Sequence, residues 1–348
     1  MIQISSGNLL KADAEAIVNT VNCVGIMGKG VALQFKQAYP ENFVAYAKAC
    51  KSGEVQLGKM FVFQTGSLFN PRYIINFPTK NHWKEKSKLN DIKTGLKELV
   101  RIVRELDIQS IAVPPLGCGN GGLEWEEVRP AIQQAFAELE NVHVLLWTPF
   151  GAPKADEIIV NTKTPNMTLI RALMVKLLSI YHVFDTKLSN LEIQKLAYFL
   201  EEAGQPLQFE FSKGQYGPYS SKLHHVLIGI EGHYIRGYGD GVSKAELHAL
   251  PRGISDADEA LRSEPDTITR LNKVSELIEG YESPYGMELL ATVHWVCKQN
   301  PKAATSYLEA VRDIKGWTER KSELFTVPHI KTAWTSLKKL GWLDSLAK

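Results

Sequence analysis

The chain has 348 residues, of which 44% are hydrophobic and 22% charged, and its net charge is +2. This balance is typical of folded globular proteins and excludes a disordered chain, and the length suffices for two domains because one core rarely grows beyond roughly 250–300 residues. So small a net charge does not by itself indicate a nucleic-acid-binding protein.

The first 150 residues alternate between strand-like and helix-like segments. Short apolar or alternating runs predict strands at Ile2–Ser5, Ala16–Thr20, Met60–Gln64, Tyr73–Phe77, Ile111–Pro114 and Val142–Trp147. Helical periodicity is present from Val31 to about Cys50, over Leu89–Leu106 and over Glu126–Leu139. The alternation predicts a parallel or mixed sheet covered on both faces. Such sheets bind ligands beyond the carboxyl ends of their strands, so the loops that follow strands are the candidate sites.

The pattern changes after Pro149, where a stretch with three prolines leads into a mainly helical region. We predict helices at Leu169–Phe184, Leu191–Ala203, Ser221–Ile230, Thr267–Tyr281, Glu288–Gln299, Thr305–Ile314 and Thr332–Leu340, and a short strand at Leu207–Phe211. The predicted organisation is a first domain at 1–152, a linker at 153–167 and a mainly helical domain at 168–348.

Two loops near the N-terminus combine asparagines with glycines. A Gly-Asn pair follows the first strand, and the second strand leads into Asn19 and Asn22. Asparagine amides donate and accept hydrogen bonds, although asparagine is also common in plain turns. Gly25, Gly28 and Gly30 then precede a helix. Glycines allow close backbone approach, and amides at a helix N-terminus bind anions such as a diphosphate.

The third loop of interest is PPLGCGNGGLEW (residues 114–125), which is the second one rich in glycine and again follows a strand and precedes a helix. The spacing of the earlier loop is Gly-x-x-Gly-x-Gly and differs from the dinucleotide-binding fingerprint. Two phosphate-binding loops at the strand ends of one sheet fit a ligand whose diphosphate is flanked by riboses.

The segments GN…AIVNTVN, GIMGKGVA and PPLGCGNGGLEW together resemble the macrodomain family. Within that family they resemble the branch that includes the human terminal ADP-ribose glycohydrolase and the bacterial DarG antitoxins. The resemblance implies a three-layer α/β/α fold around a mixed sheet and a pocket for ADP-ribose. It also implies that the following residues contact ADP-ribose: Asn8, Leu9, Asn19, Asn22, Gly28, Gly30, Val31, Ala32, Gly117, Cys118, Gly119, Asn120, Gly121, Gly122 and Leu123. Many relatives have an aspartate where Asn8 stands, which implies an altered adenine contact.

Lys80, in IINFPTKNHWK (residues 74–84), is the candidate catalytic residue that the resemblance implies. Loss of solvent lowers the pKa of a lysine, and its neutral amine is then able to attack an electrophilic carbon. The amine would either attack the anomeric carbon of the opened distal ribose or stabilise the transition state or the leaving base. Without the resemblance, the lysine-rich run around Lys80 would indicate only a solvated surface charge.

The third loop departs from the relatives that share this lysine. They have an aspartate in a GCGxDxLEW pattern, and Gly121 stands at that place here, after Asn120. If the aspartate relays protons in the relatives, this chain must use water, Asn120 or the substrate instead.

An aromatic and basic run follows the candidate lysine. His82 and Trp83 are interleaved with Lys84 and Lys86, and stacking groups among positive charges are typical of surfaces that bind single-stranded nucleic acid. A modified base must leave the stack before an enzyme reaches it. We predict DNA contacts by these four residues; the alternative is a solvated face.

The helical region resembles an interaction domain of bacterial toxin-neutralising proteins in LEIQKLAYFLEEAG (residues 191–204) and QYGPYSSKL (residues 215–223). The resemblance implies an antitoxin that binds a DarT-type ADP-ribosyltransferase toxin through this domain and removes ADP-ribose from thymidine in single-stranded DNA through the first. An acidic cluster at 256–266 either imitates DNA phosphates or is a solvated helix face.

Two alternatives stay open for the first domain, a non-enzymatic ADP-ribose reader and a glycohydrolase acting on ADP-ribosylated protein carboxylates. The four cysteines lack CxxC spacing, so neither a zinc site nor a disulfide framework is predicted. We predict no metal site and no cofactor. No signal segment or membrane-length apolar run is apparent, so we expect a cytoplasmic protein without a membrane partner.

Overall fold

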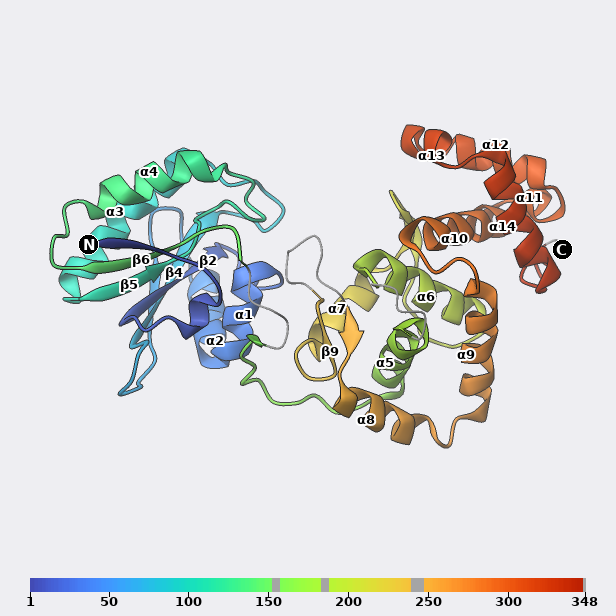
Figure 1. Ribbon diagram of the computed structural model, residues 1–348, viewed down its shortest axis with the longest axis horizontal. Helices are drawn as coiled ribbons and strands as arrows, with labels where there is room; N and C mark the ends of the chain where they lie inside the picture. Colours follow the sequence, from blue (N-terminus) through green and yellow to red (C-terminus); the bar gives the residue numbers. More distant parts are fainter. Residues whose placement is uncertain (152–156, 183–187, 239–246, 347–348) are drawn as a thin grey trace. The chain divides into compact units, whose positions relative to one another are not determined.

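The computed structural model describes residues 1–151, 157–182, 188–238 and 247–346, and the chain forms two compact units (Figure 1). The first unit takes Met1–Lys163, and the second begins at Thr164. Part of the predicted linker packs on the first unit, because the backbone N of Asn161 donates to Gln37 O and its Nδ2 donates to Ala38 O, both at 2.8 Å. None of the helices in the described ranges combines the length and apolar character needed to cross a bilayer.

A six-stranded sheet forms the middle layer of the first unit. Its strands are β1 (Ile2–Ser5), β2 (Ala16–Asn22), β3 (Phe61–Gln64), β4 (Tyr73–Lys80), β5 (Ser110–Val113) and β6 (His143–Trp147), in the order β1–β6–β5–β2–β4–β3. All neighbours are parallel except β3 and β4, which confirms the mixed sheet. The β2–β4 pairing runs past the predicted strand ends to Asn22 and Lys80, so both residues end strands at the same edge.

Helices cover both faces of the sheet because side chains alternate along each strand. In β2, Ala16 and Val18 join the core formed with α3 (Leu89–Glu105) and α4 (Trp125–Phe136), whereas Ile17 packs with Phe35 of α1 (Gly30–Ala38). Helix α2 (Pro40–Lys51) lies on the α1 side (Figure 1). The predicted three-layer α/β/α macrodomain fold is confirmed. The single helix predicted from Val31 to Cys50 is two helices, because a residue that precedes proline, here Tyr39, avoids helical geometry.

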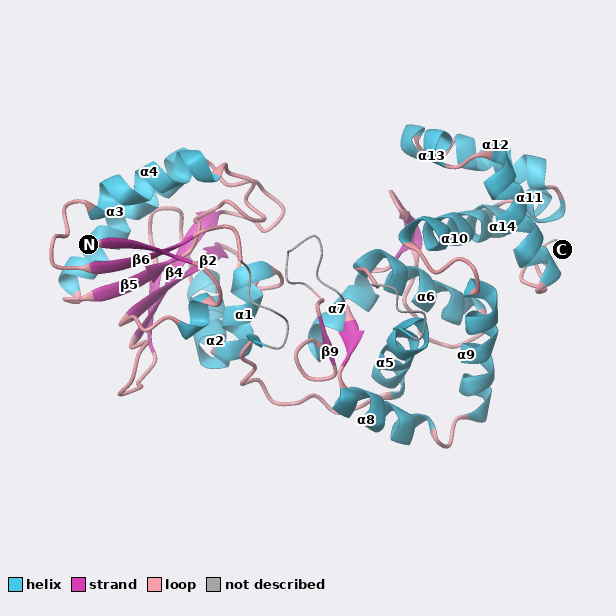
Figure 2. Cartoon of the chain, viewed as in Figure 1, coloured by secondary structure: helices cyan, strands magenta, loops and turns pink. Residues whose placement is uncertain are grey.

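The second unit is mainly helical, as predicted (Figure 2). Its helices are α5 (Leu169–His182), α6 (Asn190–Glu202), α7 (Ser221–Ile230), α8 (Pro251–Leu261), α9 (Pro265–Ile278), α10 (Pro284–Gln299), α11 (Pro301–Thr305), α12 (Tyr307–Lys315), α13 (Glu319–Leu324) and α14 (Val327–Lys339). Two short antiparallel pairs join β7 (Ser212–Gly214) to β8 (Gly217–Tyr219) and β9 (Ile235–Arg236) to β10 (His248–Ala249).

The prediction of a strand at Leu207–Phe211 is wrong. Gln208 and Glu210 have φ values of 59° and 53°, which a regular strand does not permit. This backbone turns both Leu207 and Phe209 into the core, where each is 3% exposed. The two left-handed residues place alternate side chains in the core without a strand, which explains why the apolar-polar alternation of the sequence was misleading here. Helix α8, which the sequence reading missed, carries part of the acidic cluster.

Candidate active site

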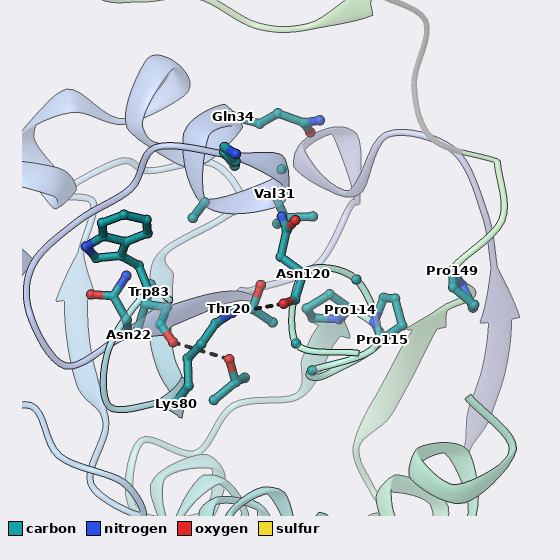
Figure 3. Close-up of a pocket in the computed structure, with 18 of the residues that line it drawn as sticks. Thr20, Asn22, Val31, Gln34, Lys80, Trp83, Pro114, Pro115, Asn120 and Pro149 are labelled. Atoms are coloured by element: carbon teal, nitrogen blue, oxygen red, sulfur yellow. Dashed lines mark hydrogen bonds between the residues drawn. The ribbon is translucent and has the colours of Figure 1, made fainter. Parts of the chain in front are cut away.

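A cavity of about 720 Å³ opens in the first unit at the carboxyl ends of its parallel strands (Figure 3). Residues that end β2, β4 and β6 line it, together with the two glycine-rich loops. The position agrees with the rule that open α/β sheets bind ligands beyond their strand ends. The loops chosen from the sequence and Lys80 thus border one cavity.

The first glycine-rich loop is held in shape by Asn22. Its Nδ2 donates to Ile26 O at 2.6 Å, and its Oδ1 accepts from the backbone N of Val24 at 3.0 Å. The Tyr46 hydroxyl of α2 donates to Asn22 O at 2.5 Å. Asn22 lines the cavity, but its amide is largely occupied by its own loop.

Helix α1 begins at the cavity wall. Gly30 is the first residue of the helix and has φ +57°, in the left-handed region that favours glycine. Gly28, Val31 and Ala32 line the cavity beside it. The N-terminal amides of a helix have no partner within the helix, so this wall suits a phosphate group.

The third loop turns too tightly for a side chain at Gly121. A Cβ at this position would lie 2.3 Å from Gly117 O and 2.4 Å from Ser87 Oγ. Any side chain at this position, an aspartate included, therefore does not fit this loop conformation. Gly117, Gly119, Asn120 and Gly121 line the cavity.

Three predicted third-loop residues lie outside the cavity lining. Cys118 is half-buried, and burial raises its thiol pKa to about 11. Leu123 packs against the core beneath α3 and α4. Gly122 faces Lys86, whose Nζ would lie 3.0 Å from a Cβ at Gly122.

Lys80 joins β4 to the third loop. Its Nζ donates to Asn120 O at 3.1 Å (Figure 3) and to Glu85 O at 3.2 Å. Burial lowers the pKa of Lys80, the charge of Lys86 lowers it further, and the Glu85 carboxylate opposes both effects. The amine therefore lies in the cavity, close to the third loop, with a raised neutral fraction.

The predicted adenine-side residues divide between the cavity and its surroundings. Leu9 lines the cavity, whereas Asn8 borders a smaller hollow of about 450 Å³. The Oδ1 of Asn8 accepts from Leu10 N at 3.0 Å, and its Nδ2 donates to Glu157 O at 2.9 Å. Asn19 is fully buried and donates to Asn76 Oδ1 at 2.9 Å, beneath the site.

The end of β6 supplies lining residues that the sequence reading missed. Trp147, Thr148 and Pro149 border the cavity, and the Trp147 indole N–H donates to Gly7 O at 3.0 Å. Ligands bind beyond the carboxyl ends of the strands, and a strand ending at Trp147 was predicted from the sequence. The residues at and after Trp147 could therefore have been identified in the same way as the three loops. Glu85 was also missed, because its surface turn has no motif.

Three of the four predicted DNA-contacting residues, Trp83, Lys84 and Lys86, form an exposed rim of the cavity. Trp83 is 48% exposed, and its ring centroid lies 5.3 Å from that of His82. Lys84 Nζ lies 5.0 Å from the centroid of the Trp83 ring. Trp83, Lys84 and Lys86 line the cavity, whereas His82, which precedes them in the sequence, lies outside the lining. An exposed indole between cations is available for stacking on a base.

The acidic cluster of the second unit is partly neutralised. Asp258 pairs with Lys176 at 2.6 Å, and Asp256 lies 3.7 Å from Arg252. No group of three or more His, Cys, Asp or Glu side chains suited to a metal ion occurs in the described ranges.

Comparison with known proteins identifies the family. Residues 18–132 match the Macro domain. The DNA ADP-ribosyl glycohydrolase of Thermus aquaticus is 45% identical over 99% of this chain and 94% of its own length, and that of Mycobacterium tuberculosis is 44% identical over 96% and 98%. A DNA ADP-ribosyl transferase-DNA ADP-ribosyl glycohydrolase fusion protein of Thermosipho africanus is 32% identical over 42% of each chain. The chain therefore belongs to the DNA ADP-ribosyl glycohydrolase family of enzymes, and its first unit carries their Macro domain.

Proposed function

We propose that the chain hydrolyses the N-glycosidic bond between ADP-ribose and thymidine in single-stranded DNA, and that Lys80 acts in this reaction. The observation that supports the proposal most is the position of the Lys80 amine, in a cavity of about 720 Å³ and bonded to the third loop. A cavity of this size suits a nucleotide-sugar ligand. The α1 N-terminus and the third loop offer backbone amides to its diphosphate.

The amine of Lys80 has two possible routes, and both use its position. A neutral amine attacks the anomeric carbon of the opened distal ribose, and the lowered pKa of Lys80 favours this form. Alternatively, the protonated amine stabilises the negative charge that develops on the leaving base. Either route returns free ADP-ribose and unmodified DNA.

The rim provides a place for the DNA. Exposed Trp83 offers a stacking surface for an unpaired base, with Lys84 and Lys86 available to phosphates. A base stacked there would place its bond to ADP-ribose near the cavity. His82 contacts the Trp83 ring and supports its position.

For the second unit we propose binding and neutralisation of a DNA ADP-ribosyltransferase toxin of the DarT type. The fusion protein of Thermosipho africanus carries a transferase and a glycohydrolase in one chain by its name, which supports a functional pairing of the two activities. The first unit would reverse the modification, and the second would block the enzyme that makes it.

The decisive experiment measures free ADP-ribose released from ADP-ribosylated single-stranded DNA by the wild-type chain and by Lys80→Ala. We expect Lys80→Ala to lose at least about 100-fold in turnover, the scale of a removed catalytic group, while binding of ADP-ribose persists. Equal turnover would contradict the role of Lys80. Binding without any wild-type turnover would identify a reader instead, and faster release from a modified glutamate peptide would identify a protein glycohydrolase.

The same variant tests the second unit. Lys80→Ala, mixed at equal concentration with the cognate transferase, should still block ADP-ribosylation of a fresh oligonucleotide. Since this variant does not remove the modification, the block would come from binding alone. Undiminished transferase activity would refute the proposed neutralisation.

A further inference from the structure

The cavity lining includes one acidic residue, Glu85, which the sequence did not single out. Among the described residues that line the cavity, the only acidic side chain is Glu85; the other titratable lining side chains are Lys29, Lys80, Lys84 and Lys86. Hydrolysis of a glycosidic bond removes a proton from water and delivers one to the leaving atom, and side-chain carboxylates commonly perform both transfers. Lysine ammonium groups cannot take up that proton.

The tight third loop makes this carboxylate important. The backbone at Gly121 leaves no space for an acidic side chain, because a Cβ would lie 2.3 Å from Gly117 O. Asn120 lines the cavity nearby, but a carboxamide does not exchange protons at neutral pH as a carboxylate does. The proton-transfer group must therefore come from outside this loop.

A compact turn fixes Glu85 beside the candidate lysine. The backbone N of Glu85 donates to His82 O at 3.0 Å, and one carboxylate oxygen accepts from the backbone N of His82 at 3.4 Å. The backbone carbonyl of Glu85 accepts from Lys80 Nζ at 3.2 Å. The Glu85 carboxylate also acts on the Lys80 amine through space, since its charge raises the pKa of that amine. The turn thus holds Glu85 next to the Lys80 amine, and both residues line the cavity.

We propose that Glu85 is the general base and acid of the hydrolysis, in place of an aspartate in the third loop. This inference rests on the proposed function. On the route in which the protonated Lys80 amine stabilises the leaving base, the Glu85 carboxylate takes a proton from water as the water oxygen bonds to the anomeric carbon. The bond between that carbon and the base nitrogen breaks, and its electron pair stays on the nitrogen. The protonated Glu85 then gives its proton to this nitrogen, so one water is consumed and the carboxylate is regenerated.

The test compares Glu85→Gln with Glu124→Gln in the full chain, using release of ADP-ribose from a modified single-stranded oligonucleotide. Glu124 is a matched control, because it belongs to the last residues of the third loop, directly before α4, but lies outside the cavity lining. We expect Glu85→Gln to lower kcat by about 100-fold and to change the Kd for ADP-ribose little. Glu124→Gln should match the wild type.

Rescue separates proton transfer from a purely structural role. Glu85→Ala should regain turnover on addition of formate, a small carboxylate, and Glu85→Asp should keep part of it. The inference is refuted if Glu85→Gln turns over within threefold of wild type, or if formate restores no turnover to Glu85→Ala. A wild type that releases no ADP-ribose, or an active Lys80→Ala, would instead refute the proposed function, so the two failures are distinguishable.

Discussion

The two units treat charged side chains in opposite ways. The first arranges Lys80, Lys84, Lys86 and Glu85 around an open cavity. The second buries several charges in its core: Lys321 is fully buried, and its Nζ donates to Glu288 and to Thr292 Oγ1 at 3.0 Å. Charges that border a cavity remain available to a ligand, whereas charges paired in a core fix helices to one another. Accessibility therefore decides which charged groups are candidates for chemistry.

Two lysines make the same point. Burial lowers the pKa of Lys195 in the second unit to about 7, and Lys195 is 2% exposed. Its Nζ donates to Pro218 O at 2.7 Å, which fixes β8 against α6. Lys80 also has a lowered pKa, but it borders a cavity. A perturbed amine is thus a poor guide to function unless a substrate can reach it.

The contrast between accessible and buried charges predicts its largest effect for Lys321→Met, on the stability of the second unit. Removing the ammonium leaves Glu288 buried with only Arg320, which bonds it at 2.8 and 3.0 Å. We expect the free energy of unfolding of the second unit to fall by about 3 kcal/mol, measured by urea unfolding monitored through tryptophan fluorescence. ADP-ribose affinity, measured by calorimetry, should not change.

Lys298→Met is the matched control, because Lys298 pairs with Glu202 at 2.5 Å but is 41% exposed. Exposed pairs contribute about 0–1 kcal/mol, so this variant should be nearly neutral. Equal losses from both variants would contradict the view that the second unit depends on its buried charges.

Much of this contrast was visible in the sequence for the first unit and little of it for the second. In the first unit, the glycine-rich loops lie between a predicted strand and a predicted helix, and both kinds of element show a clear hydrophobic period. The position of the loops at strand ends was therefore predictable for Gly28, Gly30, Gly117 and Gly119. Lys195 and Lys321 lie in ordinary amphipathic runs, and burial depends on which helices pack together. Sequence periodicity locates elements, but it does not show how distant helices meet.

A second, smaller effect concerns acidic pH and His294. Burial lowers the pKa of His294 to about 3, and its Nδ1 lies 2.8 Å from the Tyr198 hydroxyl. An unfolded histidine titrates near about 6.5, so between pH 6.5 and 3 the unfolded state binds more protons. The stabilising effect of neutral His294 is therefore complete above pH 6.5 and is lost as the pH falls.

Urea unfolding of the second unit should lose about 1.4 kcal/mol per pH unit from this histidine between pH 6 and pH 5. In His294→Gln that part of the slope should disappear, although the variant is less stable overall. The comparison is restricted to this range because buried Glu288 has a lowered pKa and affects stability only at more acidic pH. An unchanged slope in the variant would show that His294 does not carry the proton linkage.

The smallest effect tests whether the rim charges of the first unit serve a ligand. Lys84→Glu/Lys86→Glu should weaken binding of a modified oligonucleotide about tenfold and reduce the salt dependence of its affinity, because each lost phosphate contact removes about 0.7 from the slope for single strands. Binding is measured by fluorescence anisotropy at several salt concentrations. Lys93→Glu/Lys97→Glu, a double charge reversal on exposed positions of α3, controls for net charge. If both double variants bind equally, the rim lysines are ordinary solvated charges, and only the cavity distinguishes the first unit from the second.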